Sequence, residues 1–135
     1  GDVYKRQYLT SIRQLSSLPG DIRELVIMRV ASVNGAPYEA DQHAPIALKE
    51  GLSQAQLDAL PDWEASTLFS ERERAVLAYT DAMTRQVQVP EPVFQAARAA
   101  MGSDKLTVEL TATVAAYNMV SRFLEALQVH SHDHR

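Results

Sequence analysis

The stretch DIRELVIMRVASVNGAPYEADQH, residues 21–43, predicts two antiparallel helices joined by a tight turn. Apolar residues recur at intervals of three and four, which predicts a helix over residues 22–33 with Asp21 as its N-cap. Asn34-Gly35 is a typical helix stop. Pro37, a residue favoured at the first helical position, begins a second helix over residues 37–50, and Pro45 is expected to kink it.

Helical signals also fill the rest of the chain. Capping-box patterns begin at Ser53, in a helix that we expect to close at Pro61, and at Ser70. The further helices are expected at residues 8–15, 53–60, 70–89, 92–101 and 104–128. The last is apolar nearly all round, which indicates a central helix or one shared with a subunit interface. Without any pattern of period two, the sequence predicts an all-α, compact antiparallel bundle of about six to seven helices.

Composition restricts the classes of function. The chain has 135 residues, which suits one domain, expected over residues 8–128. A net charge of -4 with both signs interspersed argues against a nucleic-acid partner. No apolar run is long enough to span a bilayer, so we expect a cytoplasmic protein without a membrane partner. The absence of cysteine removes disulfides, thiolate metal sites and dithiol redox chemistry.

Both ends of the chain are set apart from the expected domain. Residues 1–7 are similar to a translated sequencing-library adapter, and we interpret the chain as a metagenomic fragment without its natural N-terminus. The alternative is a natural N-terminus that frays. Residues 129–135 form a His-rich tail with His130, His132 and His134. We expect adventitious metal binding there, and no metal or other cofactor in the protein.

Residues of the first stretch form a candidate acid–base cluster. Ala36, Glu39 and His43 lie at i, i+3 and i+7, one stripe of one helix. The Glu39 carboxylate can therefore bond one imidazole nitrogen of His43 and raise the basicity of the other nitrogen. Glu24 would approach from the preceding helix. The alternative is structural, because acidic residues are common in first helical turns, where they complement the helix dipole, and a single histidine is usually a structural residue.

The same register resembles a known family. In the alkylhydroperoxidase D branch the pattern is Glu, eleven residues, Cys, two, Cys, three, His, and this chain has Glu24, Ala36, Glu39 and His43 at those places. The resemblance continues through residues 62–64, 70–73 and 116–123. The chain is thus similar to the carboxymuconolactone decarboxylase and alkylhydroperoxidase D-like superfamily, in a decarboxylase-type branch that lacks the Cys-x-x-Cys pair. This resemblance implies an alkylhydroperoxidase D-like fold.

The resemblance implies a non-redox reaction, because thiol peroxidase chemistry requires an attacking thiolate and this chain has none. The type reaction of the decarboxylase branch releases carbon dioxide from a carboxylated muconolactone in aromatic catabolism. Catalytic roles are then expected for His43, which would move the proton, for Glu39, which would orient it, and for Glu24, which would tune the charge. Alternatives are another small substrate, or a binding or scaffold protein that has lost the thiol peroxidase activity.

Three further residues are candidates for binding a small carboxylated substrate: Tyr38, Asn118 and Arg122. Each has a structural alternative, in which Tyr38 is a buried aromatic anchor, Asn118 a satisfied core amide and Arg122 a surface arginine. Members of the family assemble as trimers or hexamers. The resemblance therefore implies a homo-oligomer, in agreement with the apolar last helix.

Overall fold

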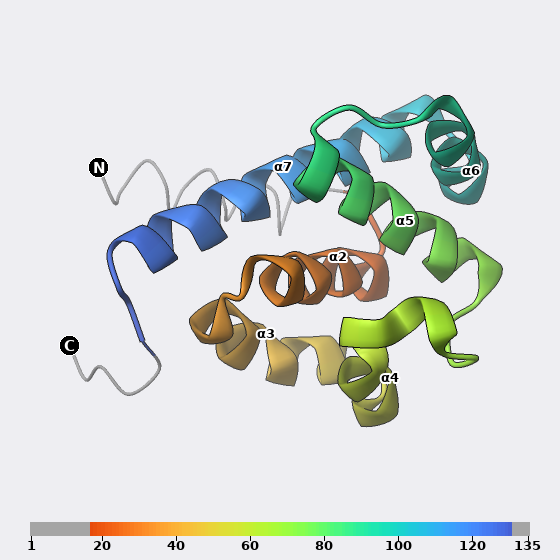
Figure 1. Ribbon diagram of the computed structural model, residues 1–135. Helices are drawn as coiled ribbons and strands as arrows, with labels where there is room; N and C mark the ends of the chain where they lie inside the picture. The colour runs from red at the N-terminus through yellow and green to blue at the C-terminus, as the bar shows by residue number, and fades with distance from the viewer. Residues whose placement is uncertain (1–16, 131–135) are drawn as a thin grey trace.

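The computed structural model describes residues 17–130, and these residues form six α-helices and one 3-10 helix (Figure 1). In chain order the elements are α2 (Gly20–Asn34), α3 (Pro37–Lys49), α4 (Gln54–Ala59), η1 (Leu60–Ala65), α5 (Glu71–Gln86), α6 (Glu91–Met101) and α7 (Asp104–Ala126). The predicted all-α class is confirmed, with no strand in the described range. The predicted helix over residues 8–15, the leader of residues 1–7 and most of the His-rich tail lie outside the described residues.

The centre of the fold is α2, which lies between α3 on one side and α5 and α7 on the other (Figure 1). Its side chains are buried on all sides, so that Leu25, Val26 and Ile27 are inaccessible to solvent. By contrast, α7 buries one face and leaves apolar side chains such as Val108, Met119 and Phe123 exposed on the other. No helix formed by residues 17–130 is long and apolar enough to cross a membrane.

The tight turn between α2 and α3 follows from Gly35. This residue adopts the left-handed conformation with φ 61°, and the amide of Ala36 donates to the carbonyl of Ala31 at 2.8 Å. The prediction that Asp21 is the N-cap was wrong by two positions. Pro19 occupies the cap position, so the helix begins at Gly20 and Asp21 lies in its first turn. The chain at Pro19 is already extended, with ψ 140°, and the helix can begin directly after it.

Other helix boundaries differ from the sequence prediction by one to three residues. For example, α5 ends at Gln86 rather than at residue 89, and α7 ends at Ala126 rather than at residue 128. The helix α3 continues through Pro45 and ends at Lys49, one residue earlier than expected. Helical structure does not end at Pro61, because α4 is followed directly by η1, which begins at Leu60. Pro61 lies in the first turn of η1, where a backbone amide would have no hydrogen-bond partner, so the missing amide of proline costs nothing there. The capping boxes are confirmed, with Ser53 and Ser70 each accepting a hydrogen bond from a backbone amide three residues on, at 3.1 Å.

A buried ion pair links α2 to α5 and η1. Arg29 donates from Nε and Nη2 to the two carboxylate oxygens of Asp81, at 2.7 and 2.9 Å, and from Nη1 to the carbonyl of Leu60 at 2.8 Å. The indole of Trp63 donates to Asp81 Oδ2 at 3.0 Å. Trp63 is therefore a buried anchor of the fold.

Replacing Arg29 by methionine is expected to lower the free energy of unfolding by about 3–5 kcal/mol, because Asp81 would then be a buried charge without its main partner. The matched control is Arg85→Met, since Arg85 lies 3.8 Å from the same carboxylate but is 54% exposed, and its loss should cost under about 1 kcal/mol. Urea unfolding of both variants measures the difference. Equal, small losses would contradict a structural role for the Arg29–Asp81 pair.

Candidate active site

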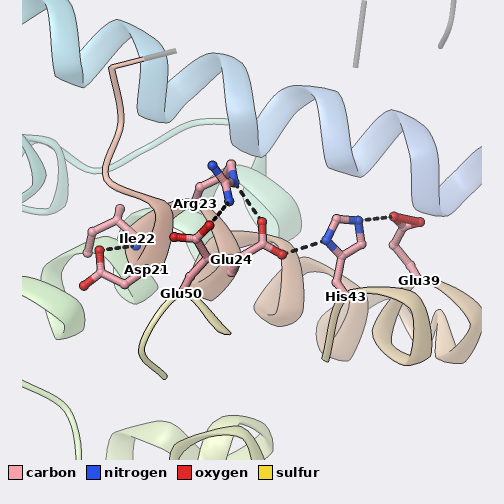
Figure 2. Close-up of polar contacts among 7 residues, drawn as sticks. All are labelled: Asp21, Ile22, Arg23, Glu24, Glu39, His43 and Glu50. Carbon is pink, nitrogen blue, oxygen red and sulfur yellow. Dashed lines mark hydrogen bonds and ion pairs between the residues drawn. The ribbon is translucent and has the colours of Figure 1, made fainter. Parts of the chain in front are cut away.

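The turn at Gly35 places the start of α3 against α2, so that residues of the two helices meet side by side. Glu24 is in the first half of α2 and is inaccessible to solvent. Glu39 is in the first turn of α3, and His43 lies one turn further along the same face. All three side chains are buried between the two helices and α7 (Figure 2).

His43 lies between two carboxylates. Its Nδ1 is 2.7 Å from Oε1 of Glu24, and its Nε2 is 3.2 Å from Oε1 of Glu39 (Figure 2). The exposed fractions are 0% for Glu24, 6% for His43 and 7% for Glu39. The expected contact between Glu39 and His43 is thus present, and Glu24 joins it from α2.

The arrangement differs from the sequence prediction in one respect. That prediction placed Glu39 on one ring nitrogen as the orienting group and brought Glu24 near from the preceding helix, whereas both nitrogens of His43 are engaged by carboxylates. The shorter contact comes from Glu24, so Glu24 orients the ring. The two carboxylates lie at opposite edges of the ring.

In the described part of the chain, no group of three or more His, Cys, Asp or Glu residues could hold a metal ion.

The surroundings shift the protonation of the site. Burial by itself would lower the pKa of His43, but hydrogen bonds and charge interactions with Glu24 and Glu39 outweigh it and raise that pKa from 6.5 to about 9. Burial would likewise raise the pKa of Glu24, but hydrogen bonds from His43 and Arg23, together with their positive charges, hold it below its ordinary value. At neutral pH the site therefore contains an imidazolium next to an ionised Glu24.

Three contacts of the site were missed from the sequence. Arg23 donates from Nε to Oε2 of Glu24 at 2.8 Å and from Nη2 to Oε1 of Glu50 at 3.2 Å (Figure 2). Consecutive residues of a helix do not normally face each other, so the sequence carried no signal for the first contact. The ring of Tyr117 on α7 meets the His43 ring edge-on, with centroids 5.5 Å apart and planes at 85°. Tyr117 lies in the last helix, which the sequence showed only as apolar nearly all round.

The three predicted substrate-binding residues do not contact the His43 cluster through any described interaction. Asn118 connects three helices, accepting from Asn34 on α2 at 3.0 Å and donating to Thr84 on α5 at 2.9 Å. Arg122 is exposed and donates to the side chain of Asn118. Tyr38 is half-buried in the first turn of α3. These contacts are structural, and a substrate-binding role for the three residues stays a prediction.

An apolar cavity of about 350 Å³ lies at the corner between α2 and α3. Ala36, the N-cap residue of α3, and Ala40 of α3 line it together with side chains of α2, α4 and η1, among them Met28, Leu57 and Leu60. None of the three side chains of the His43 cluster lines this cavity. Ala36 connects the two features, because it occupies the first cysteine position of the family pattern and lies one turn before Glu39 and Ala40.

The family model described as "Carboxymuconolactone decarboxylase family" matches residues 6–82, more than half of the chain. The protein belongs to this family. The match includes Glu24, Glu39 and His43, so the buried cluster lies within the part of the chain that defines the family.

This member of the carboxymuconolactone decarboxylase family is similar to two uncharacterized bacterial proteins. It is 28% identical over 117 residues to YnjA of Escherichia coli K12 and 28% identical over 85 residues to YdfG of Bacillus subtilis 168. These alignments cover 87% and 62% of this chain. The chain spans only 64% of the length of YnjA and 58% of the length of YdfG.

Solved structures share the fold. ATU0492 of Agrobacterium tumefaciens, a protein of unknown function and candidate AhpD-type antioxidant defence protein, has a TM-score of 0.89 at 25% identity, over 97% of this chain and 90% of that one. A peroxidase-related protein from Silicibacter sp. TM1040 has a TM-score of 0.83 at 18% identity, over 94% and 68%. The debrominase Bmp8 has a TM-score of 0.78 at 19% identity, over 95% and 69%. The last two show the fold alone, and all three support the alkylhydroperoxidase D-like architecture.

Raising the pH is expected to destabilise this protein, because His43 loses its proton. The unfolded chain loses this proton near pH 6.5 and the folded protein near pH 9, so the stabilisation is complete below pH 6.5 and is lost as the pH rises through about 9. The loss should be on the order of 1–3 kcal/mol. Urea unfolding between these pH values measures it. His43→Gln should show a flatter profile, and a wild-type profile no steeper than that of the variant would contradict the assignment.

Proposed function

We propose that the protein is a non-redox, acid–base lyase that removes carbon dioxide from a small carboxylated lactone or a related carboxylate. The observation that carries this proposal is the buried His43 held between Glu24 and Glu39, at 2.7 and 3.2 Å. Thiol peroxidase chemistry is not proposed, because the chain contains no cysteine. A carboxylate at position 39, where the family pattern has a thiol, keeps proton transfer available and removes the redox couple.

In the proposed reaction, His43 is the general acid. The bond between the ring carbon and the carboxylate breaks, carbon dioxide leaves, and the electron pair stays on that carbon, delocalised into the lactone carbonyl. The His43 imidazolium then delivers a proton to the carbon and becomes neutral, and a proton from solvent restores it. The raised pKa of His43, about 9, means that the acid is already charged at neutral pH. No cofactor takes part in these steps.

Glu24 and Glu39 have different roles in this mechanism. Glu24 makes the shorter contact and is inaccessible to solvent, so it stays on Nδ1 and fixes the ring orientation. Glu39 makes the longer contact, to Nε2, and its side chain is 9% exposed. In this mechanism the Glu39 side chain is displaced from Nε2 when substrate binds, and Nε2 is the nitrogen that donates the proton to the substrate carbon.

The apolar cavity at the α2–α3 corner offers space for the body of a small substrate. Its volume of about 350 Å³ is in the range of small-molecule sites, and its wall includes Ala36, one turn from Glu39. Tyr38, Asn118 and Arg122 remain candidates for contacts to the carboxylate groups. The exposed apolar face of α7 supports the homo-oligomer that the family resemblance implies.

Loss of the imidazole should abolish most of the activity. We expect wild-type protein to release carbon dioxide from 4-carboxymuconolactone, and His43→Gln to lower kcat/KM by about 10²–10⁴-fold, the usual contribution of a general acid. His130→Gln, a substitution at an exposed residue near the end of the described chain, is the matched control and should match wild type. Equal turnover by wild type and His43→Gln would refute the role of His43. Absence of turnover by wild type on a panel of carboxylated lactones would refute the proposed reaction.

The pH profile tells an acid from a base. If His43 donates the proton, kcat/KM should be constant around neutral pH and fall as the pH rises through about 9, where the imidazolium is lost. A profile that rises toward pH 9 would instead require a neutral imidazole and would contradict the proposed direction of transfer. Steady-state rates on the same lactone measure the profile.

A further inference from the structure

We propose that Arg23 and Glu50 are positioning residues of the His43 site: Arg23 holds the second oxygen of Glu24, and Glu50, packed against Gly20, holds Arg23. The purpose of this arrangement rests on the proposed acid–base function, but its physical effect on His43 does not depend on turnover. The five side chains form one row of alternating charge, from Glu50 through Arg23, Glu24 and His43 to Glu39 (Figure 2).

The first half of the inference rests on how Glu24 is shared. Its Oε1 is 2.7 Å from His43 Nδ1, while its Oε2 accepts from Arg23 Nε at 2.8 Å. Each oxygen thus faces a different cation, and the carboxylate plane is held from both ends. Because Glu24 is inaccessible to solvent, water does not compete for these two contacts.

The role of Glu50 in the inference rests on the space beside Gly20, which has no side chain. A Cβ atom added at Gly20 would lie 2.0 Å from Oε2 and 2.6 Å from the carboxyl carbon of Glu50. The Glu50 carboxylate therefore occupies space at the start of α2 that any side chain at position 20 would take. From there its Oε1 reaches Arg23 Nη2 at 3.2 Å. A side chain at position 20 would therefore require the end of the Glu50 side chain to shift.

The charges define the expected effect on His43. Glu24 on α2 and Glu39 on α3 stabilise the imidazolium, Tyr117 on α7 contributes a ring edge, and Arg23 is the described cation nearest to Glu24 in the row. Arg23 competes with His43 for the charge of Glu24 and so makes the proton of His43 easier to release. Glu50 pairs with Arg23 and so weakens the interaction of Arg23 with Glu24. Its effect on the pKa of His43 is smaller, because the Glu50 side chain is 38% exposed.

Titration of the His43 ring by NMR tests the proposal, with the signal assigned by its absence in His43→Gln. Arg23→Gln should raise the pKa of His43 by about half a unit or more, because the competing cation is gone. Glu50→Gln should lower it by a smaller amount. Gly20→Ala should also lower it, because the new methyl group displaces the Glu50 carboxylate without changing any charge.

Two further variants separate positioning from general stability. Arg23→Lys keeps the positive charge and should bring the pKa of His43 back toward the wild-type value. Arg98→Gln removes an exposed arginine of α6 that pairs with Asp104 of α7 at 3.0 Å, and it should leave the pKa of His43 unchanged. If Arg23→Gln does not fold, the Glu50→Gln and Gly20→Ala variants, which are expected to lower the pKa of His43, still test the positioning role.

The outcomes distinguish this inference from the proposed function. An unchanged pKa of His43 in Arg23→Gln, Glu50→Gln and Gly20→Ala overturns the positioning role, whether or not the protein turns over a lactone. The expected shifts without any lactone turnover support the positioning role and refute the proposed reaction. With turnover present, the alkaline limit of kcat/KM should move to higher pH in Arg23→Gln, in parallel with the NMR titration.

Discussion

The contact between Glu24 and His43 is the interaction on which the site depends. It places an ionised carboxylate and an imidazolium, 2.7 Å apart, in the interface between α2 and α3 where solvent does not reach. A buried charge is costly unless it is paired, and each of these charges is the principal partner of the other. This constraint determines which way Glu24 points, holds the imidazole in one orientation, and leaves Nε2 as the nitrogen that faces Glu39.

The fold supplies the rigidity that this contact needs. Because α2 is surrounded by α3, α5, α7 and η1, the backbone that carries Glu24 cannot move without disturbing the core. The Arg29–Asp81 pair fixes the same helix less than two turns further along, and Gly35 fixes its connection to α3. The site is therefore built on two packed helices rather than on loops, which suits the proposed proton transfer.

The chain differs from the alkylhydroperoxidase D pattern at two positions of the site. A carboxylate at position 39 and an alanine at position 36 stand where the alkylhydroperoxidase D pattern has thiols. The glutamate and the histidine of that pattern remain in contact, while both thiols are absent. A fold shared with a peroxidase-related protein therefore does not by itself assign a peroxidase activity to this protein.

Sequence by itself determined the helical class, most helix boundaries, the family, and the pairing of Glu39 with His43, because helical periodicity, capping boxes and i, i+4 spacing are local properties of the chain. Tertiary structure alone decided that Glu24 takes Nδ1, that α2 rather than the last helix is central, and that Arg23, Glu50 and Tyr117 join the site. It also decided that Asn118 bridges α2 and α5. These contacts depend on how helices pack, and no spacing along the chain encodes which faces will meet.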